Sequence, residues 1–171
     1  EFAGRAGATV RYAPLVAPDL RLDLGALGEE LAQRGPDDPG LFAFPAQSNF
    51  SGVRHPLDLV TDARGRGWAV LLDAAAFVPT AALDLATYQP DFVTLSFYKM
   101  FGYPTGVGCL LVRKDAMARL RRPWFAGGTV NFASVAARAH ILAPGEAGFE
   151  DGTLNFLEIP AVETGLQHLA S

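Results

Sequence analysis

Residues 68–112 constrain the fold of this chain more than any other part of its sequence. Two short apolar runs in this stretch end in polar residues: the first runs into Asp73, and the second into Ser96, with Lys99 just beyond. In a parallel α/β sheet, ligands bind at the carboxyl ends of the strands. A carboxylate and an amine at two such ends therefore predict a cofactor bound between them.

Apolar strands alternate with helical patterns along the whole chain, which predicts an α/β fold: a three-layer sandwich with a mostly parallel sheet. Strands are expected at residues 8–12, 41–45, 68–72, 92–96 and 107–112. Helical patterns cover 23–34 (closed by Gly35-Pro36 and a turn at 37–40), 56 to 65 or 67, 114–120 and 155–169. Pro160 should interrupt the last helix or mark its true start. Residues 83–88 are a brief helical or irregular link, and 130–152 an excursion.

Composition excludes several classes of protein. The chain has 171 residues, of which 50% are apolar and 19% charged, so it can bury one substantial core. A net charge of −4 without a basic cluster argues against nucleic-acid binding, and no apolar run approaches the ~20 residues of a membrane span. The single cysteine, Cys109, excludes an internal disulfide framework and fits a reducing, cytoplasmic location. His55, His140 and His168 show no metal-ligand spacing, so no metal is expected.

An aspartate and a lysine at neighbouring strand ends suit one cofactor in particular. A lysine amine forms a Schiff base with an aldehyde, which is how pyridoxal 5'-phosphate is held. A carboxylate beside the ring nitrogen keeps that nitrogen protonated, so that the ring accepts electrons. The phosphate needs hydroxyls and backbone amides in tight glycine loops, and Ser96, Thr105, Gly106 and residues 149–153 provide them.

The order of these motifs resembles the class V aminotransferase, or cysteine-desulfurase-like, family of pyridoxal-phosphate enzymes. The likeness covers residues 47–169 and is carried by LLDAAAF, PDFVTLSFYKMFGYPTGVGCLLV, FAGGT and FEDGTLNF. NFSG, DAAAF, SFYK with FGYPTG, and FEDGT are most similar to the molybdenum cofactor sulfurase branch. The resemblance implies a fold-type-I PLP-dependent transferase. Residues 1–171 would then be a single, incomplete large domain of a longer protein, and a helix in 154–171 would lead toward a C-terminal small domain.

Three residues carry the ring chemistry that the resemblance implies. Lys99 in SFYK matches the Schiff-base lysine, and Asp73 in LLDAA matches the partner of the pyridine nitrogen. Asn49 in SNFSG matches the asparagine near the ring oxygen. Taken alone, Lys99 could be a surface lysine, Asp73 a helix cap and Asn49 a turn residue. Ala76 departs from the glutamine that cysteine desulfurases often carry there.

Three further residues match contacts to the cofactor phosphate. Ser96 and Tyr98 match contacts within one subunit, and Thr153 in FEDGT resembles a threonine that reaches the phosphate across a homodimer interface. Tyr98 stands where cysteine desulfurases usually carry histidine, so its ring could instead pack in the core. Thr153 could instead cap the final helix.

The resemblance implies a small-molecule amino-acid substrate, with L-cysteine the expected one. A cysteine outside this chain would attack the substrate sulfur and leave alanine and a persulfide, with the molybdenum cofactor as sulfur acceptor. The family's upstream phosphate loop is also expected outside the chain. The alternatives are another class V reaction (aminotransferase, epimerase or kynureninase-like) or a truncated, non-catalytic α/β scaffold.

Other candidate residues favour structural roles. Cys109 lies in an apolar strand pattern, where a free cysteine behaves as a small buried hydrophobe. His55 lies within the span of the likeness but outside its motifs, and we expect it to be structural. Arg119, Arg121 and Arg122 are interpreted as a solvated helix end, with binding of a substrate carboxylate as the alternative.

Overall fold

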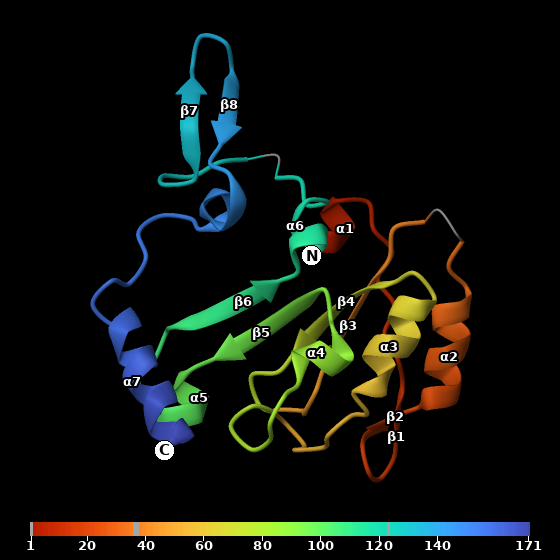
Figure 1. The fold of residues 1–171 in the computed structure, drawn as a ribbon. Helices are drawn as coiled ribbons and strands as arrows, with labels where there is room; N and C mark the ends of the chain where they lie inside the picture. Colours follow the sequence, from red (N-terminus) through yellow and green to blue (C-terminus); the bar gives the residue numbers. More distant parts are fainter. Residues whose placement is uncertain (1, 36–37, 123) are drawn as a thin grey trace. The chain divides into compact units, whose positions relative to one another are not determined.

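The computed structural model describes residues 2–35, 38–122 and 124–171. They form two compact units, unit 1 (Glu1–Thr94) and unit 2 (Leu95–Ser171). Strand β5 (Phe92–Ser96) runs across the boundary between them (Figure 1).

Unit 1 is built on a parallel sheet. Its helices are α1 (Phe2–Arg5), α2 (Leu24–Ala32), α3 (Asp58–Gly65) and α4 (Leu85–Tyr88). Its strands are the antiparallel pair β1 (Leu15–Val16) and β2 (Arg21–Leu22), then β3 (Leu41–Pro45), β4 (Ala69–Asp73) and most of β5. β4 pairs in parallel with both β3 and β5, which places Pro45, Asp73 and Thr94 side by side. The carboxyl ends of the strands therefore meet at one edge.

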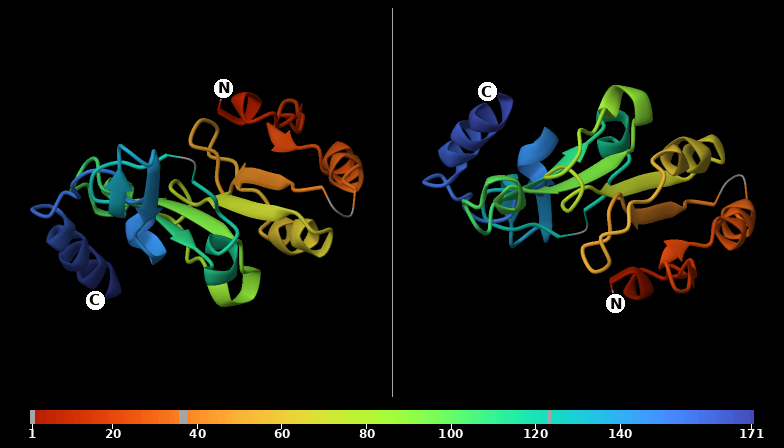
Figure 2. Two further views of the ribbon diagram at one scale, coloured as in Figure 1. Left: turned by 90° about the horizontal axis from the view of Figure 1, so that it is seen from above. Right: turned by 90° about the horizontal axis from the view of Figure 1, so that it is seen from below.

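Helices cover both faces of this sheet. Figure 2 shows α2 and α3 on opposite sides of β3 and β4. Alternate strand residues and the inner faces of the two helices form the core: Leu27, Leu31, Phe44, Val60, Ala63, Val70, Leu72 and Val93. Each fully buried Val, Leu or Phe side chain contributes about 1.5–3 kcal/mol. The predicted α/β sandwich with a mostly parallel sheet is confirmed.

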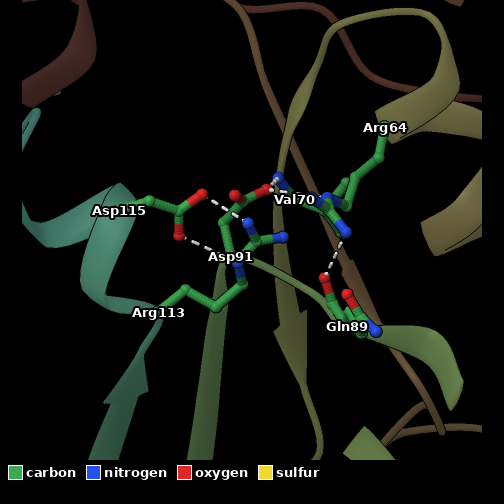
Figure 3. A network of polar contacts seen from close by, with 6 residues as sticks. All are labelled: Arg64, Val70, Gln89, Asp91, Arg113 and Asp115. Atoms are coloured by element: carbon green, nitrogen blue, oxygen red, sulfur yellow. Dashed lines mark hydrogen bonds and ion pairs between the residues drawn. The ribbon is translucent and has the colours of Figure 1, made fainter. Parts of the chain in front are cut away.

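The amino-terminal edge of this sheet is closed by a buried carboxylate. Asp91 precedes β5 and is only 3% exposed. Its Oδ2 accepts the Val70 N–H at 2.9 Å and lies 3.7 Å from the Arg64 Nε. Arg64 Nη1 also donates to the Gln89 carbonyl at 3.0 Å (Figure 3). The network joins α3, the start of β4 and the approach to β5.

Unit 2 begins with the last two residues of β5. Its elements are α5 (Tyr98–Phe101), β6 (Gly108–Val112), α6 (Lys114–Met117), β7 (Val130–Ser134), β8 (Ala139–Leu142), the 3₁₀ helix η1 (Gly145–Phe149) and α7 (Ile159–Ala170). β7 and β8 form an antiparallel hairpin. At the start of α6, Arg113 Nε donates to Asp115 Oδ1 at 3.0 Å (Figure 3). This bond, with the Arg113 charge, lowers the pKa of the Asp115 carboxyl.

Helix α7 packs beside α5 (Figure 1). The contact needs a residue without a side chain, because a Cβ on Gly165 would lie 2.4 Å from the Phe101 ring. Phe101 in turn stacks on Phe97, with ring centroids 6.3 Å apart. The turn that carries Lys99 is thereby packed against the last helix.

Most predicted elements are confirmed, and the exceptions have physical reasons. The strand expected at 8–12 is wrong: these residues are largely exposed and pair with no described strand, and β1 and β2 form the hairpin instead. Residues 130–152, expected to be an irregular excursion, contain the β7–β8 hairpin. α6 ends three residues early, and α7 starts at Ile159, so Pro160 marks its first turn. Pro36 and Asp37 of the predicted turn lie outside the described residues.

None of the helices in the described ranges combines the length and the apolar character that crossing a membrane requires.

Candidate cofactor site

Asp73 ends β4 with one carboxylate oxygen fixed and the other available. Oδ1 accepts the Ala75 N–H at 3.0 Å and the Thr94 hydroxyl at 3.1 Å. In the described part of the chain, Oδ2 takes no hydrogen bond, and the residue is exposed. Asp73 caps no described helix, because the next helix, α4, is capped by Asp84. The carboxylate is thus oriented by two bonds while an acceptor oxygen remains for a ligand.

The loop after β3 carries Asn49 and adjoins the end of β4. The Ala46 N–H donates to the Asp73 carbonyl at 2.8 Å, so the loop begins at the Asp73 backbone. Ser48 Oγ accepts the N–H of Ser51 at 3.1 Å, and the Gly52 N–H donates to the Ser48 carbonyl at 3.0 Å. These bonds form a tight turn with Asn49 exposed near its tip. Unit 1 therefore brings the Asn49 loop and Asp73 to the same strand edge.

Lys99 lies in a single helical turn directly after β5. Ser96 is the last residue of the strand, and α5 begins at Tyr98 and ends at Phe101. Gly102 caps it with a φ of +80°, which favours glycine. Lys99 and Ser96 are half-buried, whereas Tyr98 is 43% exposed. Packing of the Tyr98 ring in a core is therefore wrong for unit 2, and contact of its hydroxyl with a phosphate stays a prediction.

The FAGGT and FEDGT segments lie against each other in unit 2. The Gly152 N–H donates to the Gly127 carbonyl at 2.9 Å. A Cβ on Gly128, whose φ is +85°, would lie 2.9 Å from the Gly152 carbonyl oxygen, so only glycine fits there. The buried Thr129 closes the FAGGT turn by donating its hydroxyl to the Ala126 carbonyl at 2.8 Å.

Thr153 follows this paired segment and is exposed. The interpretation of Thr153 as a cap of the final helix is wrong, because α7 begins only at Ile159 with Glu158 preceding it. The N–H of Glu158 is instead accepted by Asn155 Oδ1 at 3.3 Å. A threonine held beside two glycine turns, without a capping role, is suited to contacting an anion.

Arg122 contacts the residues that directly precede Thr153. Its side chain is 6% exposed, pairs with the Asp151 carboxylate and donates to the Gly148 carbonyl at 2.9 Å. The guanidinium carbon lies 5.4 Å from the centre of the Trp124 ring. For Arg122 the expected solvated helix end is therefore wrong, because η1 and Asp151 contact its side chain. Arg121 is exposed, as expected.

The other singled-out residues behave as structural groups. Cys109 is half-buried, and burial raises the pKa of its thiol, which disfavours the reactive thiolate. His55 is 7% exposed, and burial, followed by the charge of Arg21, lowers its pKa. The described residues contain no cluster of three or more metal-ligating side chains.

The chemical groups of these residues are of the types that bind pyridoxal phosphate. Unit 1 offers an oriented carboxylate with a spare acceptor oxygen in Asp73, and unit 2 offers a half-buried amine in Lys99. Ser96 ends β5 shortly before the turn capped by Gly102, and Thr153 follows Gly152, whose φ is positive. That the two sets form one site, with the six predicted residues in it, stays a prediction.

Comparison with known proteins identifies the family. The sequence profile of the family Aminotransferase class-V matches residues 1–171, and the chain belongs to this family. The chain is 45% identical over 161 residues to the molybdenum cofactor sulfurase of Bos taurus, covering 87% of this chain and 18% of that protein. It is 46% identical over 141 residues to that of Homo sapiens, covering 77% and 16%. It thus spans under a fifth of the length of these relatives.

Solved structures show the same fold. The cysteine desulfurase CsdA from Escherichia coli aligns with a TM-score of 0.82 at 26% identity, over 99% of this chain and 41% of that one. A cysteine desulfurase from Thermococcus onnurineus aligns with a TM-score of 0.81 at 24% identity, over 98% and 40%. The resemblance to class V aminotransferases, and to their sulfurase branch, is confirmed.

Proposed function

We propose that the full-length protein containing this chain is a pyridoxal-phosphate enzyme that removes sulfur from L-cysteine and passes it to the molybdenum cofactor. The family match over residues 1–171 and the likeness to molybdenum cofactor sulfurases and cysteine desulfurases support this proposal. The single observation that carries it is Asp73, a carboxylate oriented through Oδ1 at the end of a buried parallel strand, with Oδ2 available.

Each residue has a defined task in this proposal. When bound, pyridoxal phosphate supplies a ring that absorbs negative charge from the amino acid's α-carbon. Asp73 Oδ2 would accept the ring N–H, and the bonds to Oδ1 hold that oxygen in place. Lys99 Nζ would hold the cofactor through its aldehyde carbon and would serve as the general base for the substrate proton. Asn49 would donate to the ring oxygen.

Phosphate binding and assembly are further parts of the proposal. Ser96 and Tyr98 would donate hydroxyl hydrogens to the phosphate within one subunit, and Thr153 would donate to the phosphate of a second copy in a homodimer. The exposure of Thr153 and its support by the FAGGT turn favour such a role. Cys109, which the structure records as a free thiol, suits a cytoplasmic location.

The chain's two lysines make the link to the cofactor directly testable. Lys99 and Lys114 are the only lysines in the sequence, and Lys114 opens α6. Full-length protein loaded with pyridoxal phosphate is treated with borohydride, digested and analysed by mass spectrometry. We expect the cofactor mass on the Lys99 peptide, retained in Lys114→Ala and absent in Lys99→Ala. Label confined to Lys114, or spread equally over both, contradicts the proposal.

The reaction is tested by its products. Full-length enzyme incubated with L-cysteine should give alanine together with protein-bound persulfide, and Lys99→Ala should give neither. A keto acid in place of alanine would identify an aminotransferase, which overturns the sulfur-transfer assignment while preserving the cofactor site.

A further inference from the structure

Arg54 joins the two loops that carry the proposed ring contacts of unit 1. We propose that Arg54 is a positioning residue: it holds the loop of Asn49 against the turn that follows Asp73, in the cofactor-free protein as well as in the enzyme. The first half of this inference concerns the loops alone, and the second half, an effect on cofactor binding, rests on the proposed function.

The guanidinium of Arg54 reaches across to the turn after β4. Nη2 donates to the Thr80 carbonyl at 3.2 Å and to the Thr80 hydroxyl at 3.0 Å. The guanidinium carbon lies 5.5 Å from the centre of the Phe77 ring. Phe77 is buried, and its N–H donates to the carbonyl of Ala74, the residue after Asp73. Arg54 is thus attached to a turn that begins beside Asp73 and is anchored in the core.

The same guanidinium closes the loop after β3. Nε donates to Gln47 Oε1 at 2.9 Å, and Gln47 and Arg54 pair as an isolated antiparallel bridge. The Ser48 N–H donates to the Val53 carbonyl at 2.8 Å. Arg54 therefore sits at the base of the hairpin-like loop that carries Asn49.

The chemistry of these contacts calls for arginine. Two edges of one rigid, planar fork serve two loops at once, while the ring of Phe77 lies near the guanidinium; a lysine ammonium offers no such fork. The acceptors are an amide oxygen, a carbonyl and a hydroxyl, so the contacts are hydrogen bonds from a charged donor, not an ion pair between two exposed charges.

The consequence is preorganisation. The loop is also held by local bonds of Ser48, by the Ala46 N–H donating to the Asp73 carbonyl, and by the Thr80 hydroxyl, which donates to Gln47 Oε1 at 3.3 Å. Arg54 adds three bonds to this set. Without the Arg54 fork, the tip gains freedom that cofactor binding must remove, and affinity falls accordingly.

The test compares Arg54→Ala and Arg54→Lys with a matched control, Arg66→Ala. Arg66 is also exposed and also bonds a side chain and a carbonyl, Asp62 Oδ1 at 3.0 Å and Gly28 at 3.4 Å, but it touches neither loop. Hydrogen exchange is measured in cofactor-free full-length protein, and the dissociation constant of pyridoxal phosphate and the melting temperature follow on the same samples.

We expect about tenfold faster exchange at the Ser48 and Gly52 amides and about tenfold weaker cofactor binding in both Arg54 variants. Arg66→Ala should change neither, and all three variants should melt within a few degrees of one another. Unchanged exchange at both amides overturns the inference, as does a lower melting temperature with unchanged cofactor affinity. Should Arg54→Ala not fold, Arg54→Lys gives the same readouts. A wild-type protein that binds no cofactor refutes the proposed function, whereas the exchange data still decide the role of Arg54.

Discussion

Asp73 and Asp91 stand at opposite ends of the same pair of strands in unit 1, and their surroundings differ in kind. Asp91 is 3% exposed and is approached by a β4 N–H and by Arg64 of α3. Asp73 is exposed, takes two bonds on Oδ1 and leaves Oδ2 available. The Asp91 carboxylate stabilises the fold, whereas the Asp73 carboxylate is oriented with one oxygen available to a ligand. Burial and partners, more than residue type, separate the structural Asp91 from Asp73, the acid that we propose contacts the cofactor.

The largest expected effect is on turnover when Asp73 is altered. Asp73→Asn keeps an acceptor oxygen for Ala75 and Thr94 but cannot stabilise a proton on the ring nitrogen, so kcat with L-cysteine should fall about 10³-fold or more, roughly 4 kcal/mol. Asp84→Asn, which alters an exposed cap of α4, is the control. Turnover of Asp73→Asn within tenfold of the control would remove Asp73 from the chemistry.

The next effect is on stability when Asp91 is altered. Asp91→Ala leaves the Val70 N–H and the Arg64 guanidinium without their buried partner, which should cost about 3 kcal/mol in the free energy of unfolding. Urea unfolding of the full-length protein measures this. Cofactor should still bind to the folded fraction. An Asp91→Ala variant that is as stable as the wild type but has lost cofactor binding would contradict the structural role of Asp91.

The third prediction concerns unit 2, where the buried Arg122 contacts residues that directly precede the exposed Thr153. Arg122→Ala leaves Asp151 unpaired and the Gly148 carbonyl without its donor; because Asp151 is 54% exposed, we expect a cost of about 2 kcal/mol. Hydrogen exchange should rise across residues 148–153, and Arg121→Ala should leave it unchanged. Equal exchange in both variants would show that Arg122 does not support the FEDGT segment.

The smallest effect is a pH dependence from His55. Burial lowers its pKa from about 6.5, so the unfolded chain takes up the proton first as the pH falls. Stability is therefore full above pH 6.5 and declines below it, by up to about 1.4 kcal/mol per pH unit until His55 protonates in the folded state. Between pH 7.5 and pH 5.5, the melting temperature should fall further for the wild type than for His55→Gln. Equal falls would mean that His55 does not titrate on unfolding.

What the sequence could predict follows local rules. The strand-end rule located Asp73, Ser96 and Lys99, because apolar runs mark buried parallel strands and the polar residue after each marks the edge. The roles of Arg54 and Arg122 were beyond reach, because each depends on a partner more than twenty residues away. The strand expected at 8–12 shows the converse. Its apolar and polar residues alternate, but without a neighbouring strand they form no hydrogen-bonded β-ladder.

The central claim is that the carboxylate of Asp73 holds the proton on the cofactor's ring nitrogen. The most direct measurement is the ¹⁵N chemical shift of full-length protein loaded with ring-labelled pyridoxal phosphate. The nitrogen should be protonated in the wild type and in Asp84→Asn, and unprotonated in Asp73→Asn. The same protonation state in Asp73→Asn as in the wild type would contradict the claim.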